Sequence, residues 1–294
     1  MNKQTVVIYH NADYDGIFCR EIARKFLPDA YFVGWNYGDP FPLINKDSQL
    51  YMLDISVDGL MDFPNLIWVD HHKSAIERYL PLFDSPDRAA YVVDGVAACR
   101  LAWQFFASGQ HFTSSLPTLD LFKTRKVNEP YAVTLAGEYD IWDHKPSEEE
   151  DISFQFGLDA VEELNWSLLL STSTEGAGYA NGIVGQGKAA QRCIAKRDAD
   201  VIQKRSFLFD FEGLKFLALN TARCNSISFA AMDTLENGHD ALMGFYWDGT
   251  KFNISLYHAK HHTDIDLSTI AVKYGGGGHR GACGFNTKEF LFIK

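Results

Sequence analysis

Short, nearly continuous apolar runs alternate with helix-like stretches over the first quarter of the chain. Runs that are apolar at almost every position, rather than at every second one, indicate strands that are buried on both faces. Such strands belong to parallel sheets covered by helices. The expected strands are residues 6–9, 31–35, 50–55 and 66–69, and an amphipathic helix is expected over about residues 15–27. The first part of the chain is therefore predicted to be an α/β domain with a parallel sheet.

A change of composition divides the rest of the chain. Helices are expected over residues 96–106 and 131–136, and an exposed acidic loop over 146–151. Residues 171–187 are rich in Ser, Thr and Gly, which predicts a linker, and a charged helix is expected over 188–204. With 294 residues, two domains are the natural expectation. We predict domains at 1–187 and 205–294, joined by a connecting helix over 188–204.

The second domain is expected to be a smaller α+β unit. Two short strands should follow residue 207, and a helix is expected near 227–235. Strands over 241–247 and 252–257, a further helix and the four glycines at 275–278 complete the predicted order.

Charge and cysteine content limit the partners and the compartment. The formal net charge of −11 argues against a long basic track, which a long nucleic acid would require. No stretch reaches the roughly 18 uninterrupted apolar residues of a membrane span. The five cysteines form no CxxC pair, so they are expected to be packing residues in a reducing compartment, and the protein is expected to be cytoplasmic. These are Cys19, Cys99, Cys193, Cys224 and Cys283.

Acidic and histidine residues gather where the predicted strands end. Each has an ordinary explanation by itself: Asp13 or Asp15 could cap a helix, Asp54 could lie in a loop and Asp140 on the surface. The carboxyl ends of parallel strands share one edge of the sheet, however, so these groups should converge. Converging carboxylates repel one another unless cations lie among them. The candidate ligand set is His10, Asp13, Asp15, Asp54, Asp70, His71, His72 and Asp140.

The types of ligand narrow the choice of metal. Carboxylates with a minority of imidazoles and no thiolate suit manganese or magnesium better than structural zinc or an iron–sulfur cluster. If the backbone stays extended at Asp70-His71-His72, neighbouring side chains point to opposite faces. His71 and His72 are then expected to do different jobs, one binding metal and the other facing the substrate.

These residues resemble a known family. The spacing His10-x-x-Asp13-x-Asp15-Gly16, followed by Asp54, Asp70-His71-His72 and Asp140, is similar to the four ordered motifs of the DHH phosphoesterases. The late run GGGGHRGACG at residues 275–284 resembles the glycine-rich motif of the DHHA1 domain. The resemblance spans nearly the whole chain and implies a DHH domain over 1–187 and a DHHA1 domain over 205–294.

The resemblance also implies two manganese ions, with magnesium or cobalt as substitutes. His10, Asp13 and Asp54 would hold one ion, and the second would be held by Asp15, Asp54, His71 and Asp140. His72 would lie against the phosphate or the leaving group, with Asp70 orienting the histidines. Two such ions lower the pKa of a bridging water and stabilise in-line displacement at phosphorus.

Substrate contacts are expected from the second domain. Glycines let backbone N–H groups approach an anion closely, which predicts phosphate binding by Gly276, Gly277, Gly278, His279 and Arg280. Arg223 could add a contact or be an ordinary surface arginine. Many relatives carry an Arg-Ser pair where this chain has Ser255-Leu256-Tyr257-His258, and Tyr257 or His258 could stack on a base instead. The nearby His261, His262, Asp264 and Asp266 are expected to form a polar loop and a helix cap.

The favoured function is therefore hydrolysis of a short oligonucleotide, a dinucleotide or a small nucleotide phosphate. Inorganic pyrophosphate or polyphosphate remains an alternative substrate, and a catalytically inactive nucleotide-binding module is an alternative from another class. Residues 182–189 nearly match a P-loop, but Ala189 stands where the Ser or Thr for magnesium belongs. A homodimer is compatible with the sequence.

Overall fold

The computed structural model describes residues 4–83, 88–109, 117–145, 150–221, 238–289 and 291. The chain forms two compact units, Met1–Ala190 and Gln191–Lys294. Each unit has its own sheet and its own hydrophobic core. No helix among the described residues is both long enough and apolar enough to cross a membrane.

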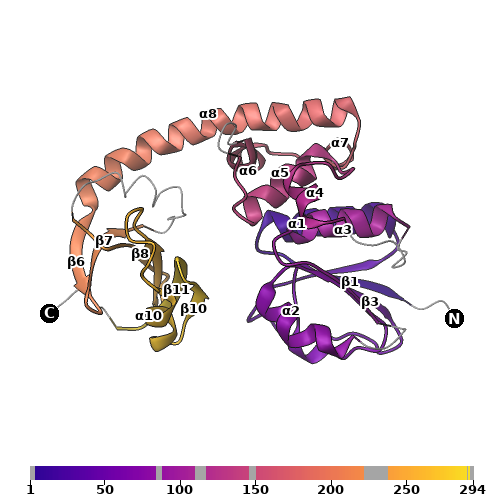
Figure 1. The fold of residues 1–294 in the computed structure, drawn as a ribbon, viewed down its shortest axis with the longest axis horizontal. Helices are drawn as coiled ribbons and strands as arrows, with labels where there is room; N and C mark the ends of the chain where they lie inside the picture. Colours follow the sequence, from indigo (N-terminus) through magenta and orange to yellow (C-terminus); the bar gives the residue numbers. More distant parts are fainter. Residues whose placement is uncertain are drawn as a thin grey trace. The chain divides into compact units, whose positions relative to one another are not determined.

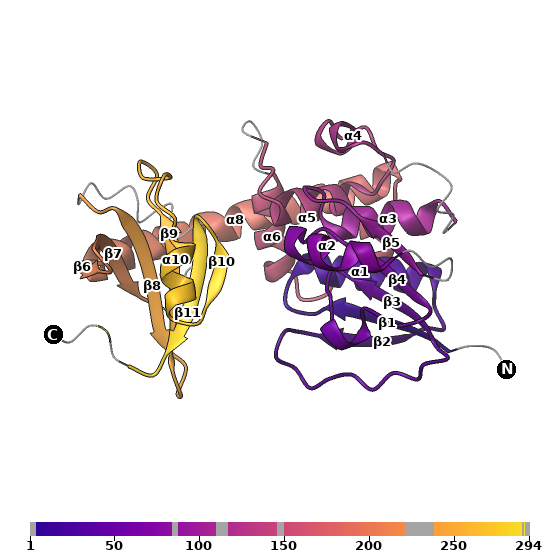
Figure 2. The ribbon, with the colours of Figure 1, turned by 60° about the horizontal axis from the view of Figure 1, so that its bottom comes forward.

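The first unit is built on a five-stranded parallel sheet. Its strands are β1 (Thr5–His10), β2 (Tyr31–Trp35), β3 (Gln49–Leu53), β4 (Leu66–Asp70) and β5 (Ala89–Val92). They are ordered β2-β1-β3-β4-β5, and every neighbouring pair is parallel (Figure 1; all five strands are labelled in Figure 2). The predicted parallel sheet is confirmed, and β5 is a strand that the sequence pattern did not indicate.

Helices cover both faces of this sheet, as Figures 1 and 2 show. In β1, Val7 and Tyr9 point into one core with α1 and α3, whereas Val6 and Ile8 point into the core beneath α2. The unbroken apolar run of β1 is explained by this double burial. The helices are α1 (Tyr14–Phe26), α2 (Lys73–Tyr79), α3 (Ala98–Ala107), α4 (Leu119–Lys123), α5 (Tyr131–Asp140), α6 (Glu150–Ala160) and α7 (Trp166–Leu169), with short 3-10 turns at Asp58–Leu60 and Leu80–Leu82.

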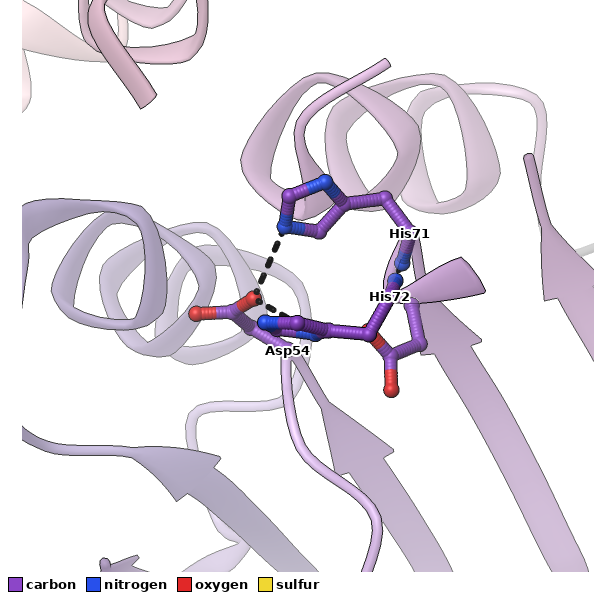
Figure 3. Close-up of side chains that lie close together, drawn as sticks. Asp54, His71 and His72 are labelled. Carbon is purple, nitrogen blue, oxygen red and sulfur yellow. Dashed lines mark hydrogen bonds and ion pairs between the residues drawn. The ribbon is translucent and has the colours of Figure 1, made fainter. Parts of the chain in front are cut away.

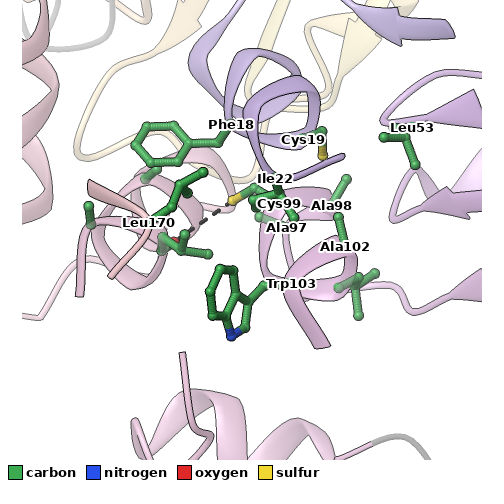
Figure 4. Close-up of a cluster of buried hydrophobic side chains, with 14 of the residues drawn as sticks. Phe18, Cys19, Ile22, Leu53, Ala97, Ala98, Cys99, Ala102, Trp103 and Leu170 are labelled. Carbon is green, nitrogen blue, oxygen red and sulfur yellow. Dashed lines mark hydrogen bonds between the residues drawn. The ribbon is translucent and has the colours of Figure 1, made fainter. Parts of the chain in front are cut away.

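Two cysteines belong to the larger of these cores. Cys19 on α1 and Cys99 on α3 are fully buried among apolar side chains such as Phe18 and Trp103 (Figure 4). Burial raises the pKa of both thiols well above the usual value, so they are unreactive packing groups. Cys283 is also buried, but Cys193 is exposed, so the prediction that all five cysteines pack inside is wrong for Cys193. Cys224 lies outside the described residues.

The long helix α8 (Thr174–Arg205) corrects the predicted linker. Residues 174–187 are helical, so the connecting helix begins well before residue 188 and the resemblance to a P-loop at 182–189 falls inside a helix. Close packing between α8 and α6 explains two glycines: a Cβ at Gly187 on α8 would lie 1.6 Å from the backbone oxygen of Ser153, and one at Gly157 on α6 would lie 2.2 Å from that of Ile183. The exposed loop predicted for 146–151 is also partly wrong, because Glu150 and Asp151 begin α6.

The second unit contains a six-stranded mixed sheet. Its order is β10-β11-β9-β8-β7-β6, in which β7 and β8 are parallel and the other neighbours antiparallel. The predicted α+β class is confirmed, whereas the helix expected near 227–235 lies outside the described residues. The elements are β6 (Phe207–Phe211), β7 (Leu214–Asn220), β8 (Ala241–Trp247), β9 (Phe252–His258), α10 (Ser268–Lys273), β10 (Gly277–His279) and β11 (Ala282–Thr287).

Candidate metal centre

The candidate ligands meet at the carboxyl edge of the parallel sheet. β1 lies between β2 and β3, so the chain leaves it on one side and returns on the other. Such a switch in strand order opens a crevice beyond the strand ends. His10 ends β1, Asp54 follows β3 and Asp70 ends β4, while Asp140 comes from the last residue of α5. The structure thus brings together side chains that are up to 130 positions apart in the sequence.

The first group of possible metal ligands is His10, Asp13 and Asp54. The Nδ1 atom of His10 lies 3.0 Å from Oδ2 of Asp13 and 3.4 Å from Oδ2 of Asp54. Asp13 also caps α1, because its Oδ1 accepts a hydrogen bond from the N–H of Gly16. A Cβ at Gly16 would lie 1.9 Å from the backbone oxygen of His10, so only glycine lets the helix begin this close to the strand.

The second group is Asp15, His71 and Asp140, and it surrounds one imidazole nitrogen. Nε2 of His71 lies 3.3 Å from Oδ2 of Asp140, 3.6 Å from Oδ2 of Asp15 and 3.5 Å from Oδ1 of Asp54. Ligand atoms at neighbouring corners of an octahedron around a divalent ion lie about 3 Å apart. The spacing of these atoms is therefore close to that of ligands around a shared cation.

Asp54 takes part in both arrangements and is the least satisfied of these residues. Its side chain is 2% exposed, and neither oxygen accepts a hydrogen bond from the residues that the structure describes. Its backbone adopts φ 58°, a left-handed conformation that few residues other than glycine adopt. Burial raises the pKa of Asp54 well above its usual value, and the neighbouring charge of Asp15 raises it further. A buried carboxylate in this state calls for a proton or a bound cation.

Other pKa shifts in the cluster agree with an excess of negative charge. The approach of Asp13, and then of Asp54, raises the pKa of His10 to about 10. Burial, and then the charge of Asp15, raises the pKa of Asp140 well above its usual value. Burial also raises the pKa of Asp13, but contact with His10 and the N–H of Gly16 outweighs it and lowers the pKa. Without metal, protons are held where a cation would otherwise compensate the charge.

Asp15 is anchored from behind by the N-terminus of α3. Its Oδ2 accepts a hydrogen bond of 2.8 Å from the N–H of Ala98, and its Oδ1 one of 2.7 Å from that of Cys99. A helix N-terminus carries partial positive charge and favours a carboxylate there. The orientation of Asp15 is thereby fixed before any ion binds.

Asp70 differs from the other carboxylates because its hydrogen bonds are already made. Oδ1 accepts from the N–H groups of His71 and His72 and faces Nδ1 of His72 at 2.6 Å, while Oδ2 accepts from the indole N–H of Trp68. Asp70, His71 and His72 lie close enough to Asp54 to form a third possible ligand group. The lone pairs of Asp70 are already engaged, and its contact with Nδ1 of His72 fits the orienting role that the family resemblance implies.

The two histidines lie side by side, contrary to the expectation that they point to opposite faces. Their ring centroids are 4.5 Å apart, and both rings approach Asp54 (Figure 3). The expectation is wrong because β4 ends at Asp70, so the alternation of a strand no longer applies. Their roles can still differ, because Nδ1 of His72 faces Asp70 whereas Nε2 of His71 faces three carboxylates. The hydrogen bond with Asp70 raises the pKa of His72.

The glycine run of the second unit forms structure rather than an open loop. Gly277–His279 is the edge strand β10, paired with β11. A Cβ at Gly276 would lie 2.0 Å from the backbone oxygen of Gly284, and Gly278 adopts φ 128°, so both glycines are needed for this pairing. His279 and Arg280 are exposed, and Arg280 donates to the backbone oxygen of Asp264. Arg223 lies outside the described residues.

Three other candidates of this unit have structural contacts. Tyr257 packs against a small core that includes Leu217 and Leu242, and Nε2 of His258 contacts the backbone oxygen of Ile265. Asp266 accepts hydrogen bonds from the N–H and hydroxyl of Ser268 at the start of α10, which is the predicted cap.

Two residues near the centre were not identified from the sequence. Tyr37 lies 6.5 Å from His10, measured between ring centroids, and Trp142 is an exposed residue with φ 57° two positions after Asp140. Their only signal in the sequence is proximity to strand and helix ends. His144, by contrast, pairs with Asp151 and stabilises the start of α6.

The structure combines a parallel-sheet α/β unit, which carries an acidic, histidine-containing cluster at its sheet edge, with an α+β unit. A scan against models of known protein families finds no match, and comparison with curated proteins finds none either. Solved structures, however, share the fold. The DHH domain of a protein described as a member of a family of ribosomal proteins aligns over 97% of this chain and 82% of its own, with 11% identity and a TM-score of 0.52. The fold of this chain is that of DHH-family proteins.

Two further structures align along almost the whole chain. A pGpG-specific phosphodiesterase from Vibrio cholerae covers 97% of this chain and 94% of its own, with 13% identity and a TM-score of 0.45. RecJ from Thermus thermophilus, in complex with Mg²⁺, covers 98% of this chain and 48% of its own, with 13% identity and a TM-score of 0.48.

Proposed function

We propose that this protein is a divalent-metal-dependent phosphoesterase that hydrolyses short oligonucleotides, dinucleotides or small nucleotide phosphates. The observation that supports this most directly is Asp54. Its carboxylate is buried between two possible ligand groups, and its oxygens accept no hydrogen bond from the described residues. A structural aspartate would be expected to have such donors, whereas a bridging metal ligand needs its lone pairs free. The DHH-type fold and the order of the sequence motifs support the same chemistry.

The residues suggest a division of labour. His10, Asp13 and Asp54 would hold one ion, and Asp15, His71 and Asp140, with the other oxygen of Asp54, would hold the second. Bound ions of this kind, for which manganese is our proposal, supply an activated water and stabilise the charge that develops at phosphorus. Asp15 enters this set already oriented by the helix N-terminus behind it.

We propose that His72 acts on the leaving group. Asp70 engages its Nδ1, which leaves Nε2 as the ring nitrogen that can face the substrate. The side chain of His72 is half-exposed, unlike that of His71. We assign to His72 the donation of a proton to the departing oxygen, with Asp70 holding the imidazole in the required tautomer.

We infer the length of the substrate from the charge of the chain. With a net charge of −11, the chain offers little surface for many phosphate contacts along a polymer. We therefore propose substrates of about two to five nucleotides, cleaved from an end, with only modest inhibition between low and physiological salt.

The test is a substrate screen after chelation. Metal-free protein should be inactive, and manganese should restore activity best, with magnesium or cobalt as weaker substitutes. The substrates are a dinucleotide, a strand of about twenty nucleotides, 3′-phosphoadenosine phosphate and inorganic pyrophosphate. Full activity without metal would refute the mechanism, and rapid hydrolysis of pyrophosphate alone would move the assignment to inorganic substrates.

We also propose that the second unit binds the substrate through the glycine run and His279, and this role needs its own measurement. Exchange of His279 for Ala should raise the KM for the dinucleotide while elemental analysis still finds two ions per chain. Because the His279 side chain is exposed on an edge strand, this substitution should leave the fold intact. Loss of an ion in His279→Ala would show that the residue was assigned to the wrong role.

A further inference from the structure

A tyrosine that is exposed yet held in place lies beside the candidate metal centre. Tyr37 follows β2 at the carboxyl edge of the sheet, and its side chain is 64% exposed. Its ring centroid is 6.5 Å from that of His10. Neither the binding of metal nor the proposed proton transfer uses this residue. Single exposed aromatic residues are common on surfaces, so the question is what holds this one in place.

The turn that carries Tyr37 is tied to the metal-binding loop. Asn36 donates its N–H to Oδ2 of Asp39 at 2.8 Å, and the N–H of Asp39 returns to the backbone oxygen of Asn36 at 2.9 Å. Gly38 adopts φ 101°, which allows the chain to reverse here. The side-chain oxygen of Asn36 also accepts the N–H of Asn11, which lies between His10 and Asp13. The position of Tyr37 is therefore coupled to the first group of ligands.

Neighbouring side chains fix the ring itself. Trp35 packs edge-on against Tyr37 with 5.6 Å between centroids, and the Trp35 indole is fixed by a hydrogen bond to the backbone oxygen of Pro40. The Tyr37 hydroxyl lies 3.4 Å from Oγ of Ser56, a buried residue two positions after Asp54. The ring is thus supported from both ligand-bearing loops while most of its surface stays accessible to solvent.

This arrangement suits stacking on a flat heterocycle. Fixing an exposed ring costs conformational entropy and gains little burial, so in the free protein the arrangement is not explained by stability alone. A nucleotide separates its phosphate from its base by one sugar, so a base can reach a ring that lies one side chain away from the metal ligands. Aromatic rings bind bases of any sequence because every base has a π-face.

We propose that Tyr37 is a substrate-binding residue whose ring stacks on the base of a nucleotide with its phosphate at the metal centre. This inference rests on the proposed function and makes it more specific: the preferred substrates carry an aromatic base, and inorganic phosphates lose this contact. The hydroxyl serves to position the ring against Ser56, so phenylalanine should largely substitute for tyrosine.

Two ligands that differ only in the base test the proposal without requiring turnover. The binding of adenosine 5′-monophosphate and of ribose 5-phosphate to manganese-loaded protein is measured by calorimetry. The natural protein should bind the nucleotide about tenfold more tightly than the sugar phosphate. Tyr37→Leu should abolish this preference and leave ribose 5-phosphate binding unchanged, whereas Tyr37→Phe should keep most of it.

Tyr31 provides a matched control. It begins β2, at the opposite end of the strand from Tyr37, and is 60% exposed. Tyr31→Leu should retain the full preference for the nucleotide, and elemental analysis should find the same metal content in all variants. Retention of the preference in Tyr37→Leu, or equal binding of the two ligands by the natural protein, would overturn the inference. An equal loss of both ligands in Tyr37→Leu would also overturn it, since the ring would then only support the site.

The outcome is separable from that of the proposed function. Hydrolysis of a dinucleotide by the natural protein, together with equal binding of the two probe ligands, keeps the phosphoesterase and removes the stacking role. A tenfold preference that depends on Tyr37, in a protein that hydrolyses none of the phosphate esters, supports the stacking role and removes the enzyme assignment.

Discussion

Two groups of buried acidic side chains in the first unit have different partners. Glu138 lies on α5 and Glu129 just before it, and each faces an arginine. Arg100 donates to Oε1 of Glu129 at 2.7 Å, and Arg125 reaches both oxygens of Glu138 at 2.8 and 2.6 Å. The carboxylates at the sheet edge have no guanidinium among their contacts in the described residues. Asp54 there meets only histidines and other carboxylates.

The difference shows where an external cation is expected. Burying a carboxylate without a partner costs several kcal/mol, so a protein normally supplies the counter-charge from its own side chains. Burial raises the pKa of Glu129 even though Arg100 opposes the shift. At Asp54 and Asp140 burial and neighbouring acids both raise the pKa, and only histidines oppose them. The chain can thus supply a buried acid with an arginine partner, and at Asp54 and Asp140 its described residues do not.

The largest expected effect comes from Asp54→Asn. Removal of a ligand shared between two ions should lower kcat/KM about 1,000-fold or more. In chelator, the same substitution should raise the free energy of unfolding by about 1 kcal/mol, because it removes an unpartnered buried charge. Activity and chemical denaturation are measured on the variant and on Asp62→Asn, an exposed control. A variant that is both active and less stable than the natural protein would show that Asp54 is not an unpartnered acid awaiting a cation, and the two acidic regions would then not differ.

The next largest effect is expected at the arginine-paired region. Glu129→Leu leaves the buried guanidinium of Arg100 without its partner and should lower the free energy of unfolding by about 3 kcal/mol. The loss should be the same with and without manganese, because Glu129 is not among the possible ligands. Urea denaturation in both conditions measures this. A loss that manganese reverses would mean that the two regions do not act independently.

Much of the acidic cluster at the sheet edge could be predicted from sequence, because it depends on where the strands end. The apolar runs give the strands, and parallel strands present their carboxyl ends at one edge, so His10, Asp54 and Asp70 had to approach one another. Asp140 is harder to predict, because it lies on α5 and not at the end of a strand. It was identified from the resemblance of the motifs to those of the DHH family. The order of strands and the presence of β5 depend on tertiary packing.

Other features could not be obtained from local patterns. The glycines of α8 resemble a linker, yet Gly187 lies against the backbone of α6, and only the partner helix reveals why glycine stands there. The directions of the His71 and His72 side chains depend on the strand ending at Asp70. A sequence pattern does not fix the end of a strand to within one residue. Tyr37 lacks a motif altogether, since its place is set by a turn bonded to Asn11.

An intermediate effect is expected from Asp70→Asn, which tests whether a satisfied acid at the sheet edge acts only through its neighbour. The amide can still accept hydrogen bonds but no longer carries the charge that holds the His72 ring. Loss of such a supporting partner typically costs 10–100-fold in activity or metal affinity, so we expect about a 30-fold lower kcat with two ions still bound. The pH–rate profile should lose or shift the limb due to His72. A bound-metal count below that of the natural protein would instead make Asp70 a ligand.

The smallest effect concerns pH and the metal-free protein. Because the pKa values of Asp54 and Asp140 are raised in the folded chain, the unfolded chain loses these protons first, and stability falls as the pH rises above the ordinary aspartate value of 3.8. The raised pKa of His10 gives stability that is complete below 6.5 and is lost as the pH rises through about 10. Both shifts act in the same direction, so the melting temperature of chelated protein should fall by a few degrees, on the order of 1 kcal/mol, between about pH 6 and pH 9.

Metal binding requires deprotonated ligands, so the stabilisation by manganese should grow over the same range. Thermal unfolding at several pH values, with chelator and with manganese, measures both slopes. Asp54→Asn should flatten the slope in chelator, whereas Glu129→Leu should leave it unchanged. Parallel slopes with and without manganese would show that the sheet-edge acids are not where the ion binds.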